Sequence, residues 1–412
     1  MLRLIHFVLI AAYIAAPVIF LSRGIYLAAR RGKRTDLQRF WLTAFGGLLS
    51  AVCVCGVFAV TIHGRVMLTQ LLLTAYFATA LLLLLKSLDR LLRLSLSSAM
   101  MLRRRPGPAW SYGLRVSFAM LMRTAVLFCI GVPYVLATVL TYRPKVSQSD
   151  NPQSMFHWSY QPVSFRAIDG TRLAGWWIPA AGGASPRTVI FCHGLSATKA
   201  TQLAMTRRLV PGGYNVLAFD FRAHGDSGGQ LITFGDAERY DVLGAVRWLR
   251  QNHANACKRL MGLGASTGGA ALIAAAADPG PEGQNIDAIA VCGTFDRLDE
   301  TVADVCHDYV PTPLKWLTLH VGLPLASAQV GYDLKNFAPA EAVKLLWPRP
   351  ILVIHGVDDQ MVQFERGQAL FDAALQPKYS DWVDRAFHED VIKREDTARL
   401  LKRYFDSAVS VL

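Results

Sequence analysis

The stretch from Arg259 to Ala277 decides the fold and reads RLMGLGASTGGAALIAAAA. Its first part is an apolar run typical of a buried strand, and its last part is an Ala-rich helical segment. The G-x-S-x-G sequence of residues 264–268 stands between them. A serine on such a sharp strand-to-helix turn needs small residues two positions away on either side, and Gly264 and Gly268 meet that need. The sequence therefore predicts an exposed nucleophile at Ser266.

Short apolar runs alternate with amphipathic segments through the C-terminal two thirds of the chain, which predicts a mostly parallel sheet flanked by helices. An Asp169-Gly170 turn separates the first two runs and indicates a hairpin. Cys192 and Cys292 end two of the runs and are expected to be free core thiols. A disulfide is the alternative if the domain is exported. The predicted strands are Val163–Ile168, Leu173–Ile178, Thr188–Cys192, Asn215–Asp220, Arg259–Leu263, Ile286–Cys292 and Ile351–His355.

A serine hydroxyl needs a base to take its proton and an acid to orient that base. The buried run from Ile351 ends at two carboxylates, Asp358 and Asp359, and either could reach a histidine. The base candidate is His388, in a loop between the last predicted strand and the final amphipathic helix. Backbone amides must also hold the developing oxyanion. Leu195, after the strand that ends at Cys192, and Thr267, after the serine, are the expected donors.

These motifs together resemble the α/β-hydrolase superfamily over about residues 165–407. The resemblance is to the bacterial branch grouped with serine aminopeptidase-like and Bem46-like hydrolases. In that family's H-G-x-x-D pattern, here His355 to Asp359, the second carboxylate is the triad acid, which favours Asp359 over Asp358. The family commonly has Gly where Ala223 stands. The other matching segments are the His193-Gly194 loop, residues 221–229 (FRAHGDSGG), Ser266 and His388.

The resemblance implies a serine hydrolase with the triad Ser266, Asp359 and His388. We expect it to cleave carboxylic esters, including lipid or other hydrophobic acyl substrates, without metal or organic cofactor. A serine aminopeptidase-type peptidase would use the same triad. A non-catalytic sensor or binding module on a membrane bundle is the third hypothesis. The hydrolase domain is expected over 153–412, with a small cap at about 294–348, where Trp316, Leu317 and Leu319 either pack or contact an acyl chain.

The first 142 residues are expected to form a membrane region of about four helices, because each apolar stretch approaches or exceeds the roughly 20 residues that span a bilayer. The formal net charge of +13 agrees with this. Lys and Arg exceed Asp and Glu only before residue 146, which suits basic loops beside membrane spans and argues against nucleic-acid binding by the globular part. The stretches are Leu4–Ala28, Phe40–Ile62, Val66–Leu85 and Val116–Thr141.

Loop charge predicts the orientation of these spans. Basic clusters at residues 30–39 and 86–115 should lie in the cytoplasm, whereas the turn at 63–65 carries one base. Four spans then place the hydrolase domain on the extracytoplasmic side of the cell membrane. Whether the number of spans is even or odd decides on which side of the membrane the hydrolase domain lies. If one stretch is only interfacial, the domain lies in the cytoplasm.

Overall fold

The computed structural model describes residues 132–142, 145, 149–309 and 312–411. The chain divides into two compact units, Met1–Phe128 and Cys129–Leu412, and the described residues belong to the second. Within them no helix is both long and apolar enough to cross a membrane. The predicted spans Leu4–Ala28, Phe40–Ile62 and Val66–Leu85 lie outside the described residues, as do both basic clusters and most of Val116–Thr141.

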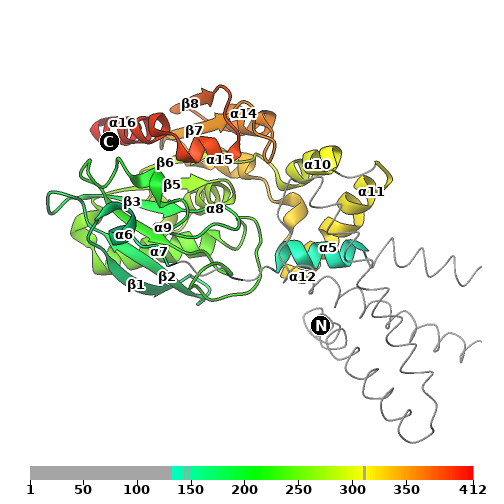
Figure 1. The fold of residues 1–412 in the computed structure, drawn as a ribbon, viewed down its shortest axis with the longest axis horizontal. Coiled ribbons are helices and arrows are strands. Elements are labelled where there is room, and N and C mark those ends of the chain that lie inside the picture. The colour runs from blue at the N-terminus through cyan, green and yellow to red at the C-terminus, as the bar shows by residue number, and fades with distance from the viewer. Residues whose placement is uncertain (1–131, 143–144, 146–148, 310–311, 412) are drawn as a thin grey trace, which may run out of the picture. The chain divides into compact units, whose positions relative to one another are not determined.

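Eight strands form one sheet in the order β1-β2-β4-β3-β5-β6-β7-β8 (Figure 1). The β1–β2 and β2–β4 pairs are antiparallel, and all the others are parallel. The predicted mostly parallel sheet is therefore confirmed. The strands are β1 Gln161–Arg166, β2 Arg172–Ile178, β3 Arg187–Cys192, β4 Asn215–Phe219, β5 Arg259–Ala265, β6 Ala288–Cys292, β7 Ile351–Gly356 and β8 Lys378–Val383.

Twelve α-helices of the described residues connect and cover these strands. They are α5 Val132–Thr141, α6 Pro152–Phe156, α7 Arg239–Asn252, α8 Thr267–Ala276, α9 Pro281–Gln284, α10 Leu298–Tyr309, α11 Thr312–Leu317, α12 Leu323–Val330, α13 Pro339–Val343, α14 Phe364–Ala373, α15 His388–Lys393 and α16 Glu395–Val411.

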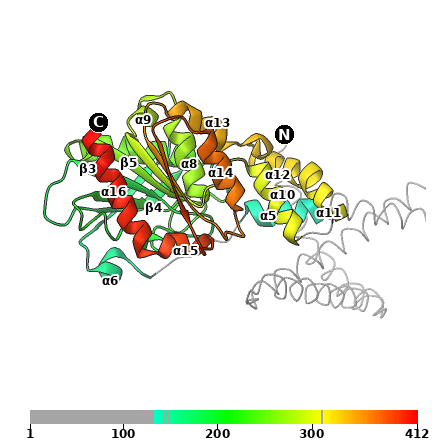
Figure 2. The same cartoon turned by 90° about the horizontal axis from the view of Figure 1, so that it is seen from above.

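The central strands of the sheet, β3 to β7, are buried on both faces. In β3, Val189 and Phe191 pack into the core shared with α15 and α16, whereas Ile190 and Cys192 pack into the core shared with α7, α8 and α14. Figure 2 shows α16 on one side of the strands and α8 with α14 on the other. Because successive side chains of a strand point to opposite faces, a strand between two helical layers is apolar throughout. The cysteines of the described residues, Cys192, Cys257, Cys292 and Cys306, are free and buried. This confirms that Cys192 and Cys292 are free core thiols.

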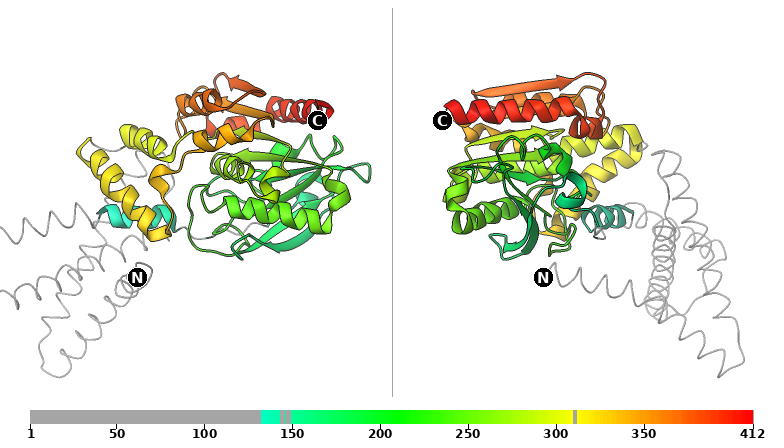
Figure 3. Two further views of the ribbon diagram at one scale, coloured as in Figure 1. Left: turned by 180° about the vertical axis from the view of Figure 1, so that it is seen from behind. Right: turned by 60° about the vertical axis from the view of Figure 1, so that its left-hand side comes forward.

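Helices α10 to α12 lie between β6 and β7 in sequence and gather with α5 at one side of the sheet (Figures 1 and 3). Gln329 of α12 is buried and donates to the Thr138 hydroxyl of α5 at 2.8 Å. An apolar cavity of about 40 Å³ lies between α5 and these helices.

Candidate active site

Ser266 occupies the turn between β5 and α8. Its backbone has φ 51° and ψ −122°, a conformation that costs a non-glycine residue energy and survives only where its surroundings hold it. Two hydrogen bonds hold it here. The Ser266 amide donates to the Cys292 carbonyl at 2.8 Å, and the Thr294 hydroxyl donates to the Ser266 carbonyl at 3.1 Å. The serine is partly exposed and stands directly before the first residue of a helix.

The glycines around Ser266 are required by close backbone contacts. A Cβ on Gly264 would lie 2.5 Å from the Gly269 Cα, and a Cβ on Gly268 would lie 2.3 Å from the His193 carbonyl oxygen. Both distances are shorter than the closest approach of a Cβ to a non-bonded carbon or oxygen atom. The G-x-S-x-G spacing thus lets β5, α8 and the loop after β3 meet at the serine.

His388 and Asp359 form a buried acid–base pair. His388 Nδ1 lies 2.6 Å from Asp359 Oδ2, and both residues are less than a tenth exposed. The other carboxylate oxygen, Oδ1, accepts the amides of Met361 and Val362, each at 2.9 Å. Because the carboxylate only accepts, the imidazole proton sits on Nδ1, which leaves Nε2 to take a proton. Asp358, by contrast, is exposed.

A second histidine borders the same carboxylate. His355, at the end of β7, is fully buried, and its Nε2 donates to the Val362 carbonyl at 2.8 Å. The same Nε2 lies 3.4 Å from Asp359 Oδ2. Burial lowers the pKa of His355, which keeps its imidazole neutral.

The serine and the histidine each border one dipeptide, Cys292-Gly293, at the end of β6. The Cys292 carbonyl accepts the Ser266 amide, as described above, and a Cβ on Gly293 would lie 2.9 Å from His388 Cε1. The parallel direction of the strands explains this arrangement. β5, β6, β7 and β8 run parallel, so the turns that follow them lie at the same edge of the sheet.

The loop after β3 also begins beside the serine. A Cβ on Gly194 would lie 3.3 Å from the Ser266 Cβ, and the Gly194 amide donates to the Gln202 side chain at 2.8 Å. Leu195 follows on this loop and is partly exposed. Thr267 is the first residue of α8, and the first amides of a helix have no carbonyl partner within it. Both amides predicted as oxyanion donors therefore belong to segments that border Ser266.

His193 holds this loop and is fully buried. Its Nδ1 donates to the Gly194 carbonyl at 2.8 Å, and its Nε2 accepts the Phe221 amide at 3.0 Å. Burial, with His224 as the next cause, lowers the pKa of His193 to about 3. A neutral imidazole with both nitrogens used in this way supports the backbone.

Two residues at the site carry no signal in a single sequence. Gly293 lies against the imidazole of His388 and has φ 59°, yet no motif marks it. Gln202 anchors the Gly194 amide from eight residues away. His388 itself differs from its prediction in one respect, because it begins the short helix α15 and does not lie in a loop.

The chain is similar to several known proteins. Residues 183–331 match the family described as "Serine aminopeptidase, S33". The chain is 27% identical over 269 residues to the uncharacterized protein YfhR of Escherichia coli O157:H7, covering 64% of this chain and 84% of that protein. It is 26% identical over 209 residues to the lysophosphatidylserine lipase ABHD12 of Danio rerio, covering 49% of this chain and 51% of that protein.

Among solved structures, the esterase Pf2001 of Pyrococcus furiosus is similar, with a TM-score of 0.53 and 27% identity. The match covers 65% of this chain and 98% of the esterase. The described residues thus have the α/β-hydrolase fold. The chain is an α/β-hydrolase enzyme, esterase-like or S33-like.

Proposed function

We propose that this protein is a serine hydrolase that cleaves carboxylic esters through Ser266, His388 and Asp359. The observation that carries the proposal is the buried His388–Asp359 pair, 2.6 Å apart, beside the dipeptide that holds the strained backbone of Ser266. A hydroxyl on such a turn, with an imidazole oriented by a carboxylate, is the arrangement that acyl transfer requires.

The reaction proceeds in two steps. Ser266 Oγ attacks the ester carbonyl carbon and passes its proton to His388 Nε2, while Asp359 keeps the imidazole oriented. The Leu195 and Thr267 amides hold the negative oxygen of the tetrahedral intermediate. The alcohol leaves with the proton from His388. Water then loses a proton to His388, attacks the acyl-serine, and releases the carboxylic acid with Ser266 restored.

The comparisons favour an ester over an amide substrate. The similar Pf2001 is named an esterase and the similar ABHD12 a lysophosphatidylserine lipase. We therefore expect the substrate to be a carboxylic ester, with lipid acyl esters as the hydrophobic end of the range. The name of the matched family keeps an aminopeptidase as the second candidate. Rates on acyl esters compared with aminoacyl amides of the same chain length separate the two.

The nucleophile can be tested by labelling with a fluorophosphonate, which bonds covalently to an activated serine and expels fluoride. Labelling of the full-length protein in membranes should be lost in Ser266→Ala. It should persist in the control Ser380→Ala, whose serine is exposed on the edge strand β8. Undiminished labelling of a folded Ser266→Ala protein would place the nucleophile elsewhere. Absence of both labelling and turnover on any ester or amide in the folded wild-type protein would favour the non-catalytic binding module.

We also propose that residues 1–142 anchor this enzyme in the cell membrane, with the hydrolase domain outside the cytoplasm. The support is the pattern of the sequence, namely apolar stretches of spanning length and basic clusters confined to the segments between them.

A further inference from the structure

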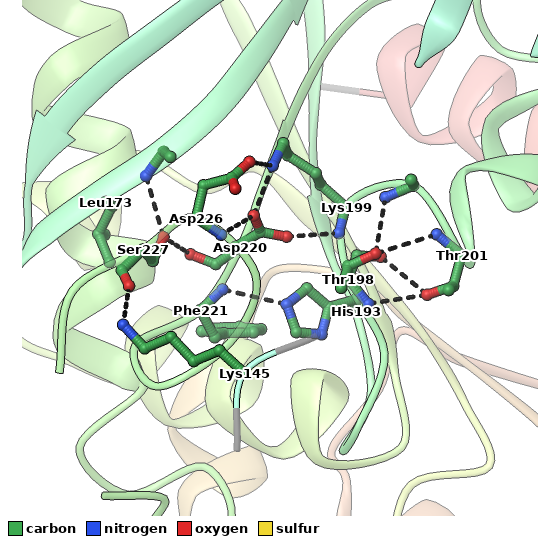
Figure 4. Close-up of polar contacts among 12 residues, drawn as sticks. Lys145, Leu173, His193, Thr198, Lys199, Thr201, Asp220, Phe221, Asp226 and Ser227 are labelled. Carbon is green, nitrogen blue, oxygen red and sulfur yellow. Dashed lines mark hydrogen bonds and ion pairs between the residues drawn. The ribbon is translucent and has the colours of Figure 1, made fainter. Parts of the chain in front are cut away.

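Lys199 is a buried lysine that the proposed mechanism does not use. The residue is 6% exposed, and its Nζ lies 2.5 Å from Asp220 Oδ2 and 2.7 Å from Asp226 Oδ2. Its ammonium also stands 4.9 Å above the centre of the Trp176 ring. A charge is costly to bury unless it is paired, so this position is specified in detail. Figure 4 shows Lys199 between the two carboxylates.

Asp220 binds two loops through their backbones as well. Its Oδ1 accepts the Lys199 amide at 2.8 Å, and its Oδ2 accepts the Asp226 amide at 3.0 Å. The loop after β4 folds tightly around this carboxylate, because a Cβ on Gly225 would lie 2.2 Å from Asp220 Oδ2. The loop after β3 and the loop after β4 are thus joined at one end by Lys199 and Asp220.

The other end of the same loop pair is joined by two further contacts. His193 Nε2 accepts the Phe221 amide at 3.0 Å, and the Ser196 amide donates to His224 Nε2 at 3.3 Å. Leu195 therefore lies in a short segment, 193–199, that is attached to the loop after β4 at three points. One point precedes Leu195, one is the residue that follows it, and one is the last residue of the segment. These attachments lie on both sides of Leu195 in the sequence.

We propose that Lys199, paired with Asp220 and Asp226, is a positioning residue that sets the Leu195 amide at the oxyanion of the reaction. The proposal rests on the proposed function, since it assigns Lys199 a part in the same acyl transfer. It differs from general stabilisation in one respect. A residue that positions an oxyanion donor affects the transition state more than the bound substrate.

The test uses Lys199→Met, which keeps the apolar stem and removes the ammonium. Active sites are first titrated with a fluorophosphonate, so that unfolded protein does not count. We expect kcat per active site on a short-chain ester to fall about tenfold, with KM within about twofold, because displacing one catalytic donor by about 1 Å can cost up to 10²-fold. Affinity for a trifluoromethyl ketone, which forms a tetrahedral adduct with serine, should fall by the same factor as kcat/KM.

Lys145→Met is the matched control. Lys145 also contacts the loop after β4, through the Ser227 carbonyl, and should keep wild-type kcat (Figure 4). A Lys199→Met enzyme with wild-type kcat per active site, or a loss confined to KM, would overturn the positioning role. If Lys199→Met fails to fold, Asp226→Asn replaces it, because the Asp226 side chain is 62% exposed. A wild-type kcat there has the same meaning, and a severalfold loss supports the role.

The two proposals fail separately. Loss of turnover in Ser266→Ala together with unchanged kcat in Lys199→Met would retain the serine hydrolase and remove the role of Lys199. Retained turnover in Ser266→Ala would remove the acyl-transfer mechanism itself.

Discussion

At the scale of single residues, Asp358 and Asp359 are adjacent carboxylates with different surroundings. Asp359 is buried against His388, whereas Asp358 is exposed. We predict that Asp359→Asn lowers kcat/KM by at least about 10³-fold, because the amide cannot keep the imidazole in the tautomer that accepts the serine proton. Asp358→Asn should stay within about twofold. Ester hydrolysis at equal titrated active sites measures both, and a larger loss in Asp358→Asn would contradict the assignment of the acid.

Gly293 allows a sharper comparison, because strain and contact can be separated. Gly293 has φ 59°, and a Cβ there would lie 2.9 Å from His388 Cε1. Gly170 in the β1–β2 turn has φ 90° with nothing within 4 Å of such a Cβ. Alanine at either position should cost roughly 1 kcal/mol of unfolding free energy through backbone strain. Only Gly293→Ala should also lose kcat, by about tenfold or more, since it displaces the imidazole. Equal activity of the two variants would show that His388 need not hold this position.

At the scale of elements, the loops after β3 and β4 are joined by a histidine that stays neutral. The pKa of His193 is lowered by burial to about 3, with His224, Asp220 and Lys199 as its charged or titratable neighbours. An unfolded histidine has a pKa near 6.5, so between about pH 6.5 and 3 the unfolded chain binds the additional proton. This group therefore makes the fold less stable as the pH falls through that window.

We predict that His193→Gln reduces the acid sensitivity of folding. The wild-type free energy of unfolding should fall between pH 6 and 4 with a contribution from His193 of up to about 1.4 kcal/mol per pH unit, and the variant should lack that contribution. Urea unfolding at several pH values measures the slope. Identical slopes for wild type and variant would mean that His193 is charged in the folded protein.

Most elements of the sheet could be predicted from the sequence, because buried strands are apolar runs between turn residues. The run predicted to end at Asp220 ends instead at Phe219, and the aspartate that follows binds both loops. The order of residues in the site was also readable, since each candidate follows a strand. The contact of Gly293 with His388 was not, because it depends on the register between strands far apart in sequence. The helix that begins at His388 has six residues, too few for a periodic pattern.

At the scale of the whole molecule, the same sequence combines two chemical environments. The described residues form an α/β-hydrolase with a buried acid–base pair, and the positive charge lies in the segment before them. The range of substrates that the enzyme meets depends on whether residues 1–142 hold it at a membrane. An enzyme held at a membrane meets hydrophobic esters that are scarce in water, which is why the proposed anchor and the proposed lipid range of substrates support each other.

Which compartment the active site occupies is therefore the last prediction. If the four apolar stretches all span the membrane, alkaline phosphatase fused after Tyr142 should be active, because that enzyme folds only outside the cytoplasm. The same reporter fused after Arg34 or Arg105, in the two basic clusters, should be inactive. A green fluorescent protein fused at the three positions should give the reverse pattern. Fluorescence after Tyr142 would mean that an odd number of stretches span, and that the hydrolase meets its esters at the cytoplasmic surface.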